Sequence, residues 1–244
     1  MTAASRKPGG PRTAMLLAAG LGERMRPLTE QTAKPLLPLG GRALMDHALD
    51  RLAEAGVETV VVNAHWQAER VAAHLAARGG EPRLVLRHEK TLLETGGGVR
   101  AALDVLGPAP FYVVNGDAFW LDGPRPALLR LADFFDPARM DGVLLLQRSS
   151  QVHADVGRGD FSLNPWGVPK RRGEREVVPY IFAGVQIVSP ALMAGMPAGK
   201  FSMNLAWDRA LEAGRLRGLV HDGAWFHLST PGDLADAEAL LRAR

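Results

Sequence analysis

The sequence predicts an α/β domain built on a doubly wound, mostly parallel β-sheet. Along the first half of the chain, short apolar runs alternate with segments whose apolar residues recur at helical spacing. This alternation is typical of right-handed crossovers that place helices on both faces of one sheet. Residues 111–114 are apolar without interruption, as expected for a central strand buried on both faces. The length of 244 residues suits a single α/β domain.

The elements of the first half end at recognisable residues. Strands are expected at 14–19, 59–63, 83–87 and 111–114, and helices at 44–55, 67–77 and 99–106. Gly56, Gly79 and Gly107 follow the three helical patterns, where glycine lets the chain leave a helix.

The second half is less regular. Strands are expected at 143–146, 161–163 and 181–188, helices at 128–134 and 205–213, and a turn-rich connection at 164–176. Asn204 is the expected cap of the helix at 205–213. Thr230 is expected to cap a final helix, with Pro231 in its first position and Asp233 in its first turn.

Residues 1–13 are expected to form a flexible tail, because they contain Pro, Gly, Ser, Arg and Lys without an apolar period. Residues 14–244 then form one domain, since the sequence contains no internal repeat and no interdomain linker. No apolar run reaches the ~20 residues of a membrane span, and the apolar stretch after the tail lacks a signal-peptide cleavage pattern. We therefore expect a cytoplasmic protein without a membrane contact, as a monomer or small homo-oligomer.

The composition excludes several kinds of site. The absence of cysteine excludes disulfides, thiolate-bound zinc, iron–sulfur clusters and a thiol nucleophile. A metal ion would be held by oxygen or imidazole ligands, which favours a hard ion such as Mg²⁺. The net charge is +3, and no block of basic residues exceeds Lys170-Arg171-Arg172. This balance favours a small phosphate-bearing ligand over nucleic acid.

A glycine-rich loop follows the first strand. The backbone N–H groups around Gly20 and Gly22 can bind phosphate, and Arg24 and Lys34 flank the loop with a planar fork and a movable point charge. No Gly-Lys-Ser/Thr follows, so the loop is not a Walker A motif, and the dinucleotide-binding pattern fails at Met25, where a third glycine is required. A tight strand-to-helix turn with surface arginines is the structural alternative.

Prolines then shape the chain beyond the loop. Pro27, Pro35 and Pro38 forbid a long helix, so we expect an extended lasso from Pro27 to Gly41 that carries Lys34.

Two later motifs are further candidates. Residues 94–98 contain three consecutive glycines before the expected helix at 99–106, which suits either a close approach of a ligand to the backbone or a flexible turn. Asn115, Gly116 and Asp117 follow a strand, where ligands of doubly wound sheets bind. Asn-Gly-Asp is a common turn sequence, so Asp117 either serves only to form the turn or is a carboxylate placed for a Mg²⁺ ion that bridges phosphate oxygens.

Together these motifs resemble the sugar-1-phosphate nucleotidyltransferases, from about Thr13 to the C-terminus. The segments that carry the resemblance are Ala18-Ala19-Gly20-x-Gly22-x-Arg24-Met25-x-Pro27-Leu28-Thr29 and Lys34-Pro35-Leu36-x-Pro38. The spacing of the later motifs, 94–98, 115–117 and 157–163, most resembles that of the N-acetylmuramate 1-phosphate uridylyltransferases of cell-wall recycling. Mannose-1-phosphate guanylyltransferases, which share the first two motifs, are the alternative.

The resemblance implies a GT-A-like nucleotidyltransferase fold, with a Rossmann-like sheet and a smaller mixed sugar-binding subregion. It implies transfer of a nucleotidyl group from an NTP, here UTP, to a sugar 1-phosphate. Catalysis is then expected from Arg24, Lys34 and Asp117. The expected nucleotide-binding residues are Ala18, Ala19, Gly20, Gly22, Arg24, Lys34, Thr95, Gly96, Gly97 and Asn115. The expected sugar-phosphate-binding residues are Arg158, Gly159, Asp160 and Gly184, and the expected metal ligand is Asp117.

His227 departs from the family pattern. The family ends its catalytic region with Trp-x-Asp-x-Gly-Thr, whereas this chain has Trp225-Phe226-His227-Leu228-Ser229-Thr230. An imidazole in place of the carboxylate weakens a Mg²⁺ site and shifts preference toward Mn²⁺. Alternatively His227 only packs, and the ion relies on Asp117, phosphates and water. Because of His227, the functional alternative is a regulatory paralogue that binds nucleotide-sugars but turns over its substrates poorly.

Overall fold

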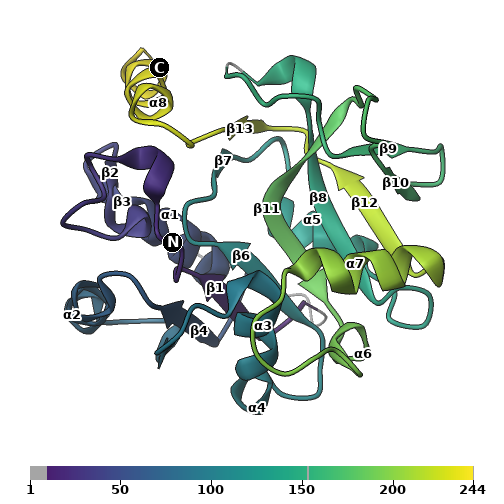
Figure 1. Ribbon diagram of the computed structural model, residues 1–244, viewed down its shortest axis with the longest axis horizontal. Coiled ribbons are helices and arrows are strands. Elements are labelled where there is room, and N and C mark those ends of the chain that lie inside the picture. Colours follow the sequence, from purple (N-terminus) through teal and green to yellow (C-terminus); the bar gives the residue numbers. More distant parts are fainter. Residues whose placement is uncertain (1–9, 153, 244) are drawn as a thin grey trace, which may run out of the picture.

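A nine-stranded sheet forms the centre of the protein in the computed structural model, which describes residues 10–152 and 154–243 (Figure 1). Four parallel strands form one half of the sheet in the order β5 (Arg83–His88), β4 (Thr59–Ala64), β1 (Thr13–Leu17) and β6 (Phe111–Asn115). The other half continues with β11 (Tyr180–Val188), β8 (Gly142–Arg148) and β12 (Leu216–Val220). Only β11 is antiparallel to its neighbours along this path, so the expected doubly wound, mostly parallel sheet is confirmed.

A small antiparallel extension leaves the sheet at β11. The register of β11 against β8 shifts between Phe182 and Gln186, and Gly184 lies in this irregular stretch with φ of 78°. On the far side of it, Tyr180 pairs with Phe161 at the start of a hairpin formed by β9 (Phe161–Leu163) and β10 (Pro169–Arg171). The bend therefore turns the first residues of β11, and the hairpin paired with them, away from the parallel half of the sheet.

The helices cover both faces of the sheet. Along β1, Ala14 and Leu16 contribute to one core and Met15 to the other, as the alternation of side chains in a strand requires. The first core lies under α1 (Leu44–Glu54), α2 (Ala68–Arg78) and α5 (Ala127–Phe134). The second lies under α3 (Glu94–Ala101), α4 (Leu103–Leu106), α6 (Pro190–Met193) and α7 (Met203–Glu212). None of the helices in the part of the chain that the structure describes has the length and apolar character needed to cross a bilayer.

The expected lasso from Pro27 to Gly41 is a folded segment. Instead of one extended path, it contains the 3-10 turn η2 (Lys34–Leu36) and the strand β2 (Pro38–Leu39), which pairs with β3 (Arg42–Ala43) just beyond it. Another 3-10 turn, η1 (Glu23–Met25), precedes it. The last helix, α8 (Pro231–Arg242), packs over it through a third core, which also contains β7 (Phe119–Leu121) beside its partner strand β13 (Ala224–Phe226) (Figure 1). Thr230 opens α8 with a full capping box, as predicted.

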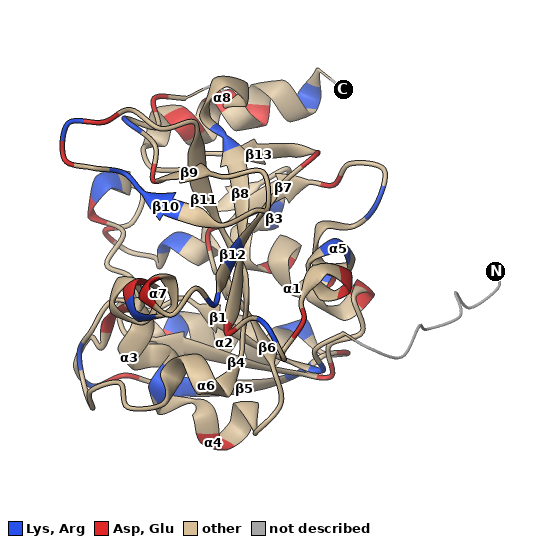
Figure 2. Ribbon diagram, turned by 90° about the vertical axis from the view of Figure 1, so that its right-hand side faces the viewer, with Lys and Arg blue, Asp and Glu red and all other residues tan. Residues whose placement is uncertain are grey.

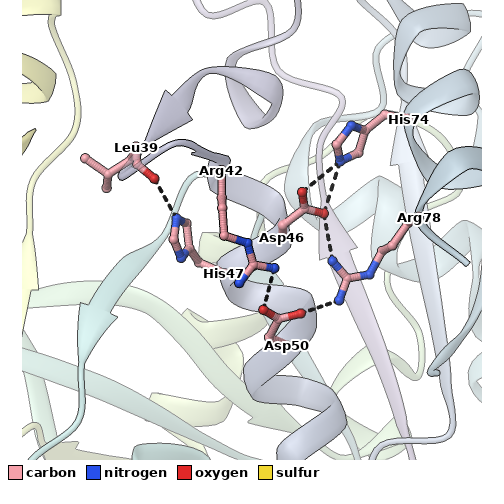
Figure 3. Close-up of polar contacts among 7 residues, drawn as sticks. All are labelled: Leu39, Arg42, Asp46, His47, Asp50, His74 and Arg78. Atoms are coloured by element: carbon pink, nitrogen blue, oxygen red, sulfur yellow. Dashed lines mark hydrogen bonds and ion pairs between the residues drawn. The ribbon is translucent and has the colours of Figure 1, made fainter. Parts of the chain in front are cut away.

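Polar side chains join α1 to α2 on the outer face of the first core (Figure 3). Arg78 of α2 binds both Asp46 and Asp50 of α1, and His74 adds a contact of 3.0 Å from Nε2 to Asp46. Burial raises the pKa of Asp50, but hydrogen bonds from Arg78 and Arg42 outweigh it and hold that pKa below its usual range. The network therefore stabilises the ionised form of Asp50 and fixes α2 against α1.

Several sequence expectations are wrong in detail. Helix α3 begins at Glu94 and not at residue 99, so the glycines of 94–98 are helical. Helix α7 is capped by Ser202 and not by Asn204, since the Ser202 hydroxyl accepts a hydrogen bond from the Asn204 amide. The turn-rich connection at 164–176 contains β10, and β12 has no counterpart among the expected strands.

The expected tail contains an ordered end. Residues 1–9 lie outside the described part of the chain, but Arg12 already joins the domain. Its carbonyl oxygen accepts hydrogen bonds from the Glu58 and Thr59 amides, at 2.8 and 3.3 Å, and its guanidinium pairs with Glu58. The first strand then runs from Thr13 to Leu17 and ends two residues earlier than expected.

Candidate functional site

The strand order reverses at β1, and the candidate site lies at this reversal. From β1 the sheet continues to β4 on one side and to β6 on the other, and Leu17 at the end of β1 is paired with Asn115 at the end of β6. Ligands of doubly wound sheets bind outside the carboxyl ends of the strands at such a point. The glycine loop leaves β1 here, and the Asn115–Asp117 turn leaves β6.

Buried hydrogen bonds fix the start of the glycine loop. Asn63, at the end of β4, accepts a hydrogen bond from the Ala18 amide through Oδ1, at 2.8 Å. Its Nδ2 donates to Glu89 Oε1 at 2.7 Å, and Glu89 Oε2 accepts from the Leu93 amide at 2.9 Å. Asn63 and Glu89 are only 3% and 6% exposed. Neither was a sequence candidate as a positioning residue, because nothing in the local sequence shows that β4 ends beside the loop.

A second set of contacts closes the loop over η1. Gly22 has φ of 65°, and its carbonyl accepts a hydrogen bond of 2.8 Å from the Thr29 hydroxyl. The Thr29 carbonyl in turn accepts from Trp66 Nε1 at 3.0 Å. A Cβ on Gly22 would lie 3.0 Å from the Thr29 side chain and 3.2 Å from Lys34 Cβ. The loop is thus held between Thr29 and the lasso, which brings Lys34 beside it.

Lys34 and Asp117 form an ion pair between η2 and the turn after β6. The Lys34 side chain is 14% exposed and that of Asp117 33%. Gly116 permits the approach, since a Cβ there would lie 2.9 Å from the Leu17 carbonyl oxygen and 3.2 Å from Pro35 Cγ. The two residues that the sequence singles out for charge, 83 positions apart, therefore touch.

Two cavities meet at this ion pair. The first, here called the loop cavity, has a volume of 360 Å³ and is bordered by the glycine loop and Asn63. The second, here called the aromatic cavity, has a volume of 410 Å³ and extends between β11, α7 and β13 along five aromatic side chains: Phe161, Phe182, Trp207, Trp225 and Phe226. Six residues border both cavities: Leu17, Lys34, Thr95, Asn115, Asp117 and Ser202. Lys34 and Asp117 therefore stand at the junction.

Most of the sequence-predicted site residues border one of these cavities. Ala18, Ala19, Gly20 and Gly22 border the loop cavity, while Lys34, Thr95, Asn115 and Asp117 border both. Arg24, Asp160, Gly184 and His227 border the aromatic cavity. Four candidates border neither of the two: Gly96, Gly97, Arg158 and Gly159.

The glycines of α3 are required by the protein itself. A Cβ on Gly96 would lie 2.4 Å from the Phe201 ring, and one on Gly97 would lie 2.2 Å from the Gly199 carbonyl oxygen. Both amides donate to the Phe201 carbonyl, at 2.9 and 3.0 Å. The close approach that the sequence suggested for a ligand is made here by the segment before α7. The expected nucleotide contact of Gly96 and Gly97 stays a prediction.

Arg158 and Gly159 belong to a structural turn. A Cβ on Gly159 would lie 2.1 Å from the Val178 carbonyl oxygen, and Arg158 Nη1 donates to the Glu174 carbonyl at 3.1 Å. They border neither cavity, and their expected contact with the sugar phosphate stays a prediction. Asp160 does border the aromatic cavity, where its Oδ2 accepts from the Phe182 amide at 2.9 Å.

Gly184 serves close packing at the bend of β11. In the left-handed conformation, a Cβ would lie 3.1 Å from Asn115 Nδ2 and 3.2 Å from Ala118 Cβ. Glycine here lets the bend of β11 contact the turn after β6, and so brings the two walls of the aromatic cavity together.

His227 lies among the charged groups of the junction. Burial lowers the pKa of His227. The negative charges of Asp233 and Asp117 act to raise that pKa, while the positive charges of Arg24 and Lys34 lower it further. Its ring centroid is 5.6 Å from that of Trp225. The imidazole is therefore neutral at neutral pH. Between residues 10 and 243, position 153 aside, no three His, Asp or Glu side chains cluster in a way that could hold a metal ion. The protein ligands available to a metal ion here are therefore Asp117 alone or Asp117 together with His227.

Sequence reasoning missed several residues that border the aromatic cavity. Arg171, Gln186 and Trp207 all do so. The basic stretch that contains Arg171 is visible in the sequence, but no local pattern indicates that it faces a cavity.

Comparisons with known proteins identify the family of the chain. Residues 14–159 match the model of the MobA-like NTP transferase domain. The chain is 42% identical over 235 residues to the N-acetylmuramate alpha-1-phosphate uridylyltransferase of Caulobacter vibrioides, which covers 95% of this chain and 97% of that protein. It is 34% identical to the protein of the same name from Neisseria meningitidis serogroup B, over 94% of this chain and 98% of that protein.

The fold has close relatives among solved structures. The inositol-1-phosphate CTP transferase from T. maritima superposes with a TM-score of 0.78 at 18% identity, over 96% of each chain. This similarity confirms the expected nucleotidyltransferase fold. The family match covers more than half of the chain, and both named relatives match it over nearly their full length. The chain is therefore a sugar-1-phosphate nucleotidyltransferase of the MobA-like NTP transferase domain family, in the group that contains the N-acetylmuramate alpha-1-phosphate uridylyltransferases.

Proposed function

We propose that this chain transfers a uridylyl group from UTP to N-acetylmuramate 1-phosphate, giving UDP-N-acetylmuramate and pyrophosphate, in the recycling of cell-wall sugars. The names of the two relatives at 42% and 34% identity support this choice of substrates. The observation that carries the reaction type is the pair of cavities that share Lys34 and Asp117 at their junction. Two substrates bound one in each cavity would meet at that point.

The loop cavity suits the nucleoside triphosphate. Ala18, Ala19, Gly20 and Gly22 border it. The Ala18 amide is already bonded to Asn63, so the backbone N–H groups proposed to bind phosphate oxygens are those of the small residues that follow it. Lys34 borders this cavity and supplies positive charge there. The aromatic cavity then takes the sugar, with its 1-phosphate directed toward Lys34 and Arg24.

The chemistry requires positioning more than activation. An oxygen of the sugar 1-phosphate attacks the α-phosphorus of UTP and forms a new P–O bond. The bond from that phosphorus to the oxygen bridging to the β-phosphorus breaks, and pyrophosphate leaves with the electron pair. The attacking phosphate is already ionised, so no protein nucleophile is needed. Arg24 and Lys34 balance the negative charge of the reacting phosphates and hold them in line. Asp117 holds the Lys34 ammonium in place before the substrates bind.

Nucleotidyltransferases of this family typically use a divalent metal ion. The residues present fit such an ion, because Lys34 takes Oδ2 of Asp117 while Oδ1 accepts no hydrogen bond from any described residue. One carboxylate completed by phosphate oxygens and water is a common arrangement for Mg²⁺. A bound ion would further neutralise the phosphate oxygens. We propose Mg²⁺ at Asp117, with Mn²⁺ favoured if the neutral imidazole of His227 also binds.

Pyrophosphate release tests the assignment. UTP, GTP, dTTP and CTP are each combined with N-acetylmuramate 1-phosphate, N-acetylglucosamine 1-phosphate, mannose 1-phosphate and glucose 1-phosphate, with Mg²⁺ or Mn²⁺. We expect the highest kcat/KM for UTP with N-acetylmuramate 1-phosphate. Preference for GTP with mannose 1-phosphate would make the chain a guanylyltransferase. Tight nucleotide binding without product under any condition would indicate a regulatory paralogue instead.

A further inference from the structure

Arg171 is a third cation of the aromatic cavity, in addition to Arg24 and Lys34. It lies on β10, a strand with two adjacent basic residues that is drawn blue in Figure 2. Arg171 borders the aromatic cavity but not the loop cavity, whereas Lys34 borders both. The cavity therefore has positive charge both at the junction and on its β10 wall.

The guanidinium of Arg171 is held rigidly. Its central carbon lies 5.4 Å from the ring centroid of Phe161 and 5.7 Å from that of Trp207. Nε donates to Asp208, and Nη2 donates to the Asn204 backbone and side-chain oxygens, both at 3.2 Å. Trp207 is itself fixed, because its Nε1 donates to Gln186 at 2.9 Å. The fork is thus oriented before any ligand arrives, which lowers the entropic cost of binding one.

One amino group of this fork is left for a ligand. Among the described residues, Nη1 of Arg171 has no hydrogen-bond acceptor, although Nε and Nη2 are both engaged. The side chain is 31% exposed, on the border of the cavity. Asp208 is more exposed, at 49%, so solvent weakens its compensation of the guanidinium charge. A planar, always charged donor with a free N–H pair is suited to an oxygen anion.

We propose that Arg171 recognises the carboxylate of the acceptor sugar and so determines its specificity. This inference rests on the proposed function. N-acetylmuramate differs from N-acetylglucosamine by a lactyl ether on O3, whose carboxylate is a second anionic group besides the 1-phosphate on C1. A ligand with two separate anionic groups matches a cavity that has Lys34 at the junction and Arg171 on its β10 wall. The Phe161 and Trp207 rings beside the guanidinium lower the polarity on one side of this second ion pair and strengthen it.

The test compares two acceptors with the Arg171→Met variant, which keeps an unbranched stem against the rings but removes the charge. Dissociation constants and kcat/KM are measured for N-acetylmuramate 1-phosphate and N-acetylglucosamine 1-phosphate. We expect N-acetylmuramate 1-phosphate to bind about 10- to 100-fold more weakly, through KM rather than kcat, as for loss of one hydrogen bond to a charged group. Binding of N-acetylglucosamine 1-phosphate should change less than about threefold. Arg171→Lys, which keeps the charge but not the fork, should lie between wild type and Arg171→Met.

Lys170→Met is the matched control, because Lys170 is the exposed neighbour on the same strand and borders neither cavity. It should bind both acceptors as wild type does. Equal weakening of both acceptors by Arg171→Met would assign Arg171 a structural role, and unchanged binding of N-acetylmuramate 1-phosphate would assign it none; either result overturns the proposal. The wild-type comparison separates the two proposals. A wild-type enzyme that turns over other sugar phosphates but does not bind N-acetylmuramate 1-phosphate rejects the proposed acceptor, and the carboxylate contact with it.

Discussion

Replacement of Lys34 by Met separates catalysis from stability, because the structure predicts very different magnitudes for the two. The Lys34–Asp117 pair is partly exposed on the Asp117 side, at 33%, so its loss should lower the free energy of unfolding by only about 1 kcal/mol. In the proposed reaction, the same ammonium, which borders both cavities, would face the charge of the reacting phosphates. Removal of one such charge-stabilising contact typically costs about 10²- to 10³-fold in turnover.

The assay measures kcat for pyrophosphate release together with urea unfolding of the same samples. Lys34→Met should lose about 10²- to 10³-fold in kcat while its urea midpoint shifts only slightly. Lys34→Arg keeps the charge at the junction and should recover part of the loss. Asp117→Asn should also lose most activity, since the lysine is then no longer held by a charged partner. Near-normal turnover of Lys34→Met would refute the role of the junction, and a large loss of stability would show that the pair is structural.

Four further outcomes test the fold around the site. Asn63→Leu leaves the buried Ala18 amide without an acceptor, so urea unfolding should show a loss of about 1–3 kcal/mol, and an unchanged midpoint would contradict the anchor. Gly97→Ala places a Cβ 2.2 Å from a backbone oxygen, so its melting temperature should fall, and a neutral result would mean that α3 can shift. Thr230→Ala removes the capping box of α8 and should cost about 1 kcal/mol in the same unfolding assay; Thr230→Ser should cost less. Burial lowers the pKa of His221 in the folded protein, so the unfolded chain binds more protons and the free energy of unfolding should fall as pH drops below about 6.5. His221→Asn should make this free energy depend less on pH, and an unchanged pH dependence would show that His221 does not cause it.

The parallel half of the sheet is predictable from the sequence because its strands carry their own signal. The uninterrupted apolar run of β6 and the glycines after α1 and α2 are local features, and the observed bounds follow them closely. Strand β12 has no such signal, since Arg217 and Gly218 interrupt its apolar residues. Only its parallel pairing with β8, 74 residues earlier at the register of Leu216 and Gly142, makes it a strand.

The charged residues of the site are also predictable, but the meaning of its glycines is not. Lys34 and Asp117 were singled out by type and position, and they touch in the structure. A run of glycines indicates that something approaches the backbone closely, but not what does so. At Gly96 and Gly97, the group that approaches the backbone belongs to the same chain, 102 to 105 residues further on. A local sequence pattern cannot indicate so distant a partner. The position of Arg171 is hidden for the same reason, since it depends on Trp207 from another element.

The common wall of the two cavities has a consequence for inhibitor chemistry. Because the same six residues border both spaces, two compounds seated one in each space would lie close together at this wall. Two weak fragments, one for each space, need only a short covalent bridge at Lys34 to become one molecule. Tethering makes the second association intramolecular, so the bridged compound gains from a high effective concentration instead of from new contacts. The length of the bridge is set by the distance between the two bound fragments at the shared wall.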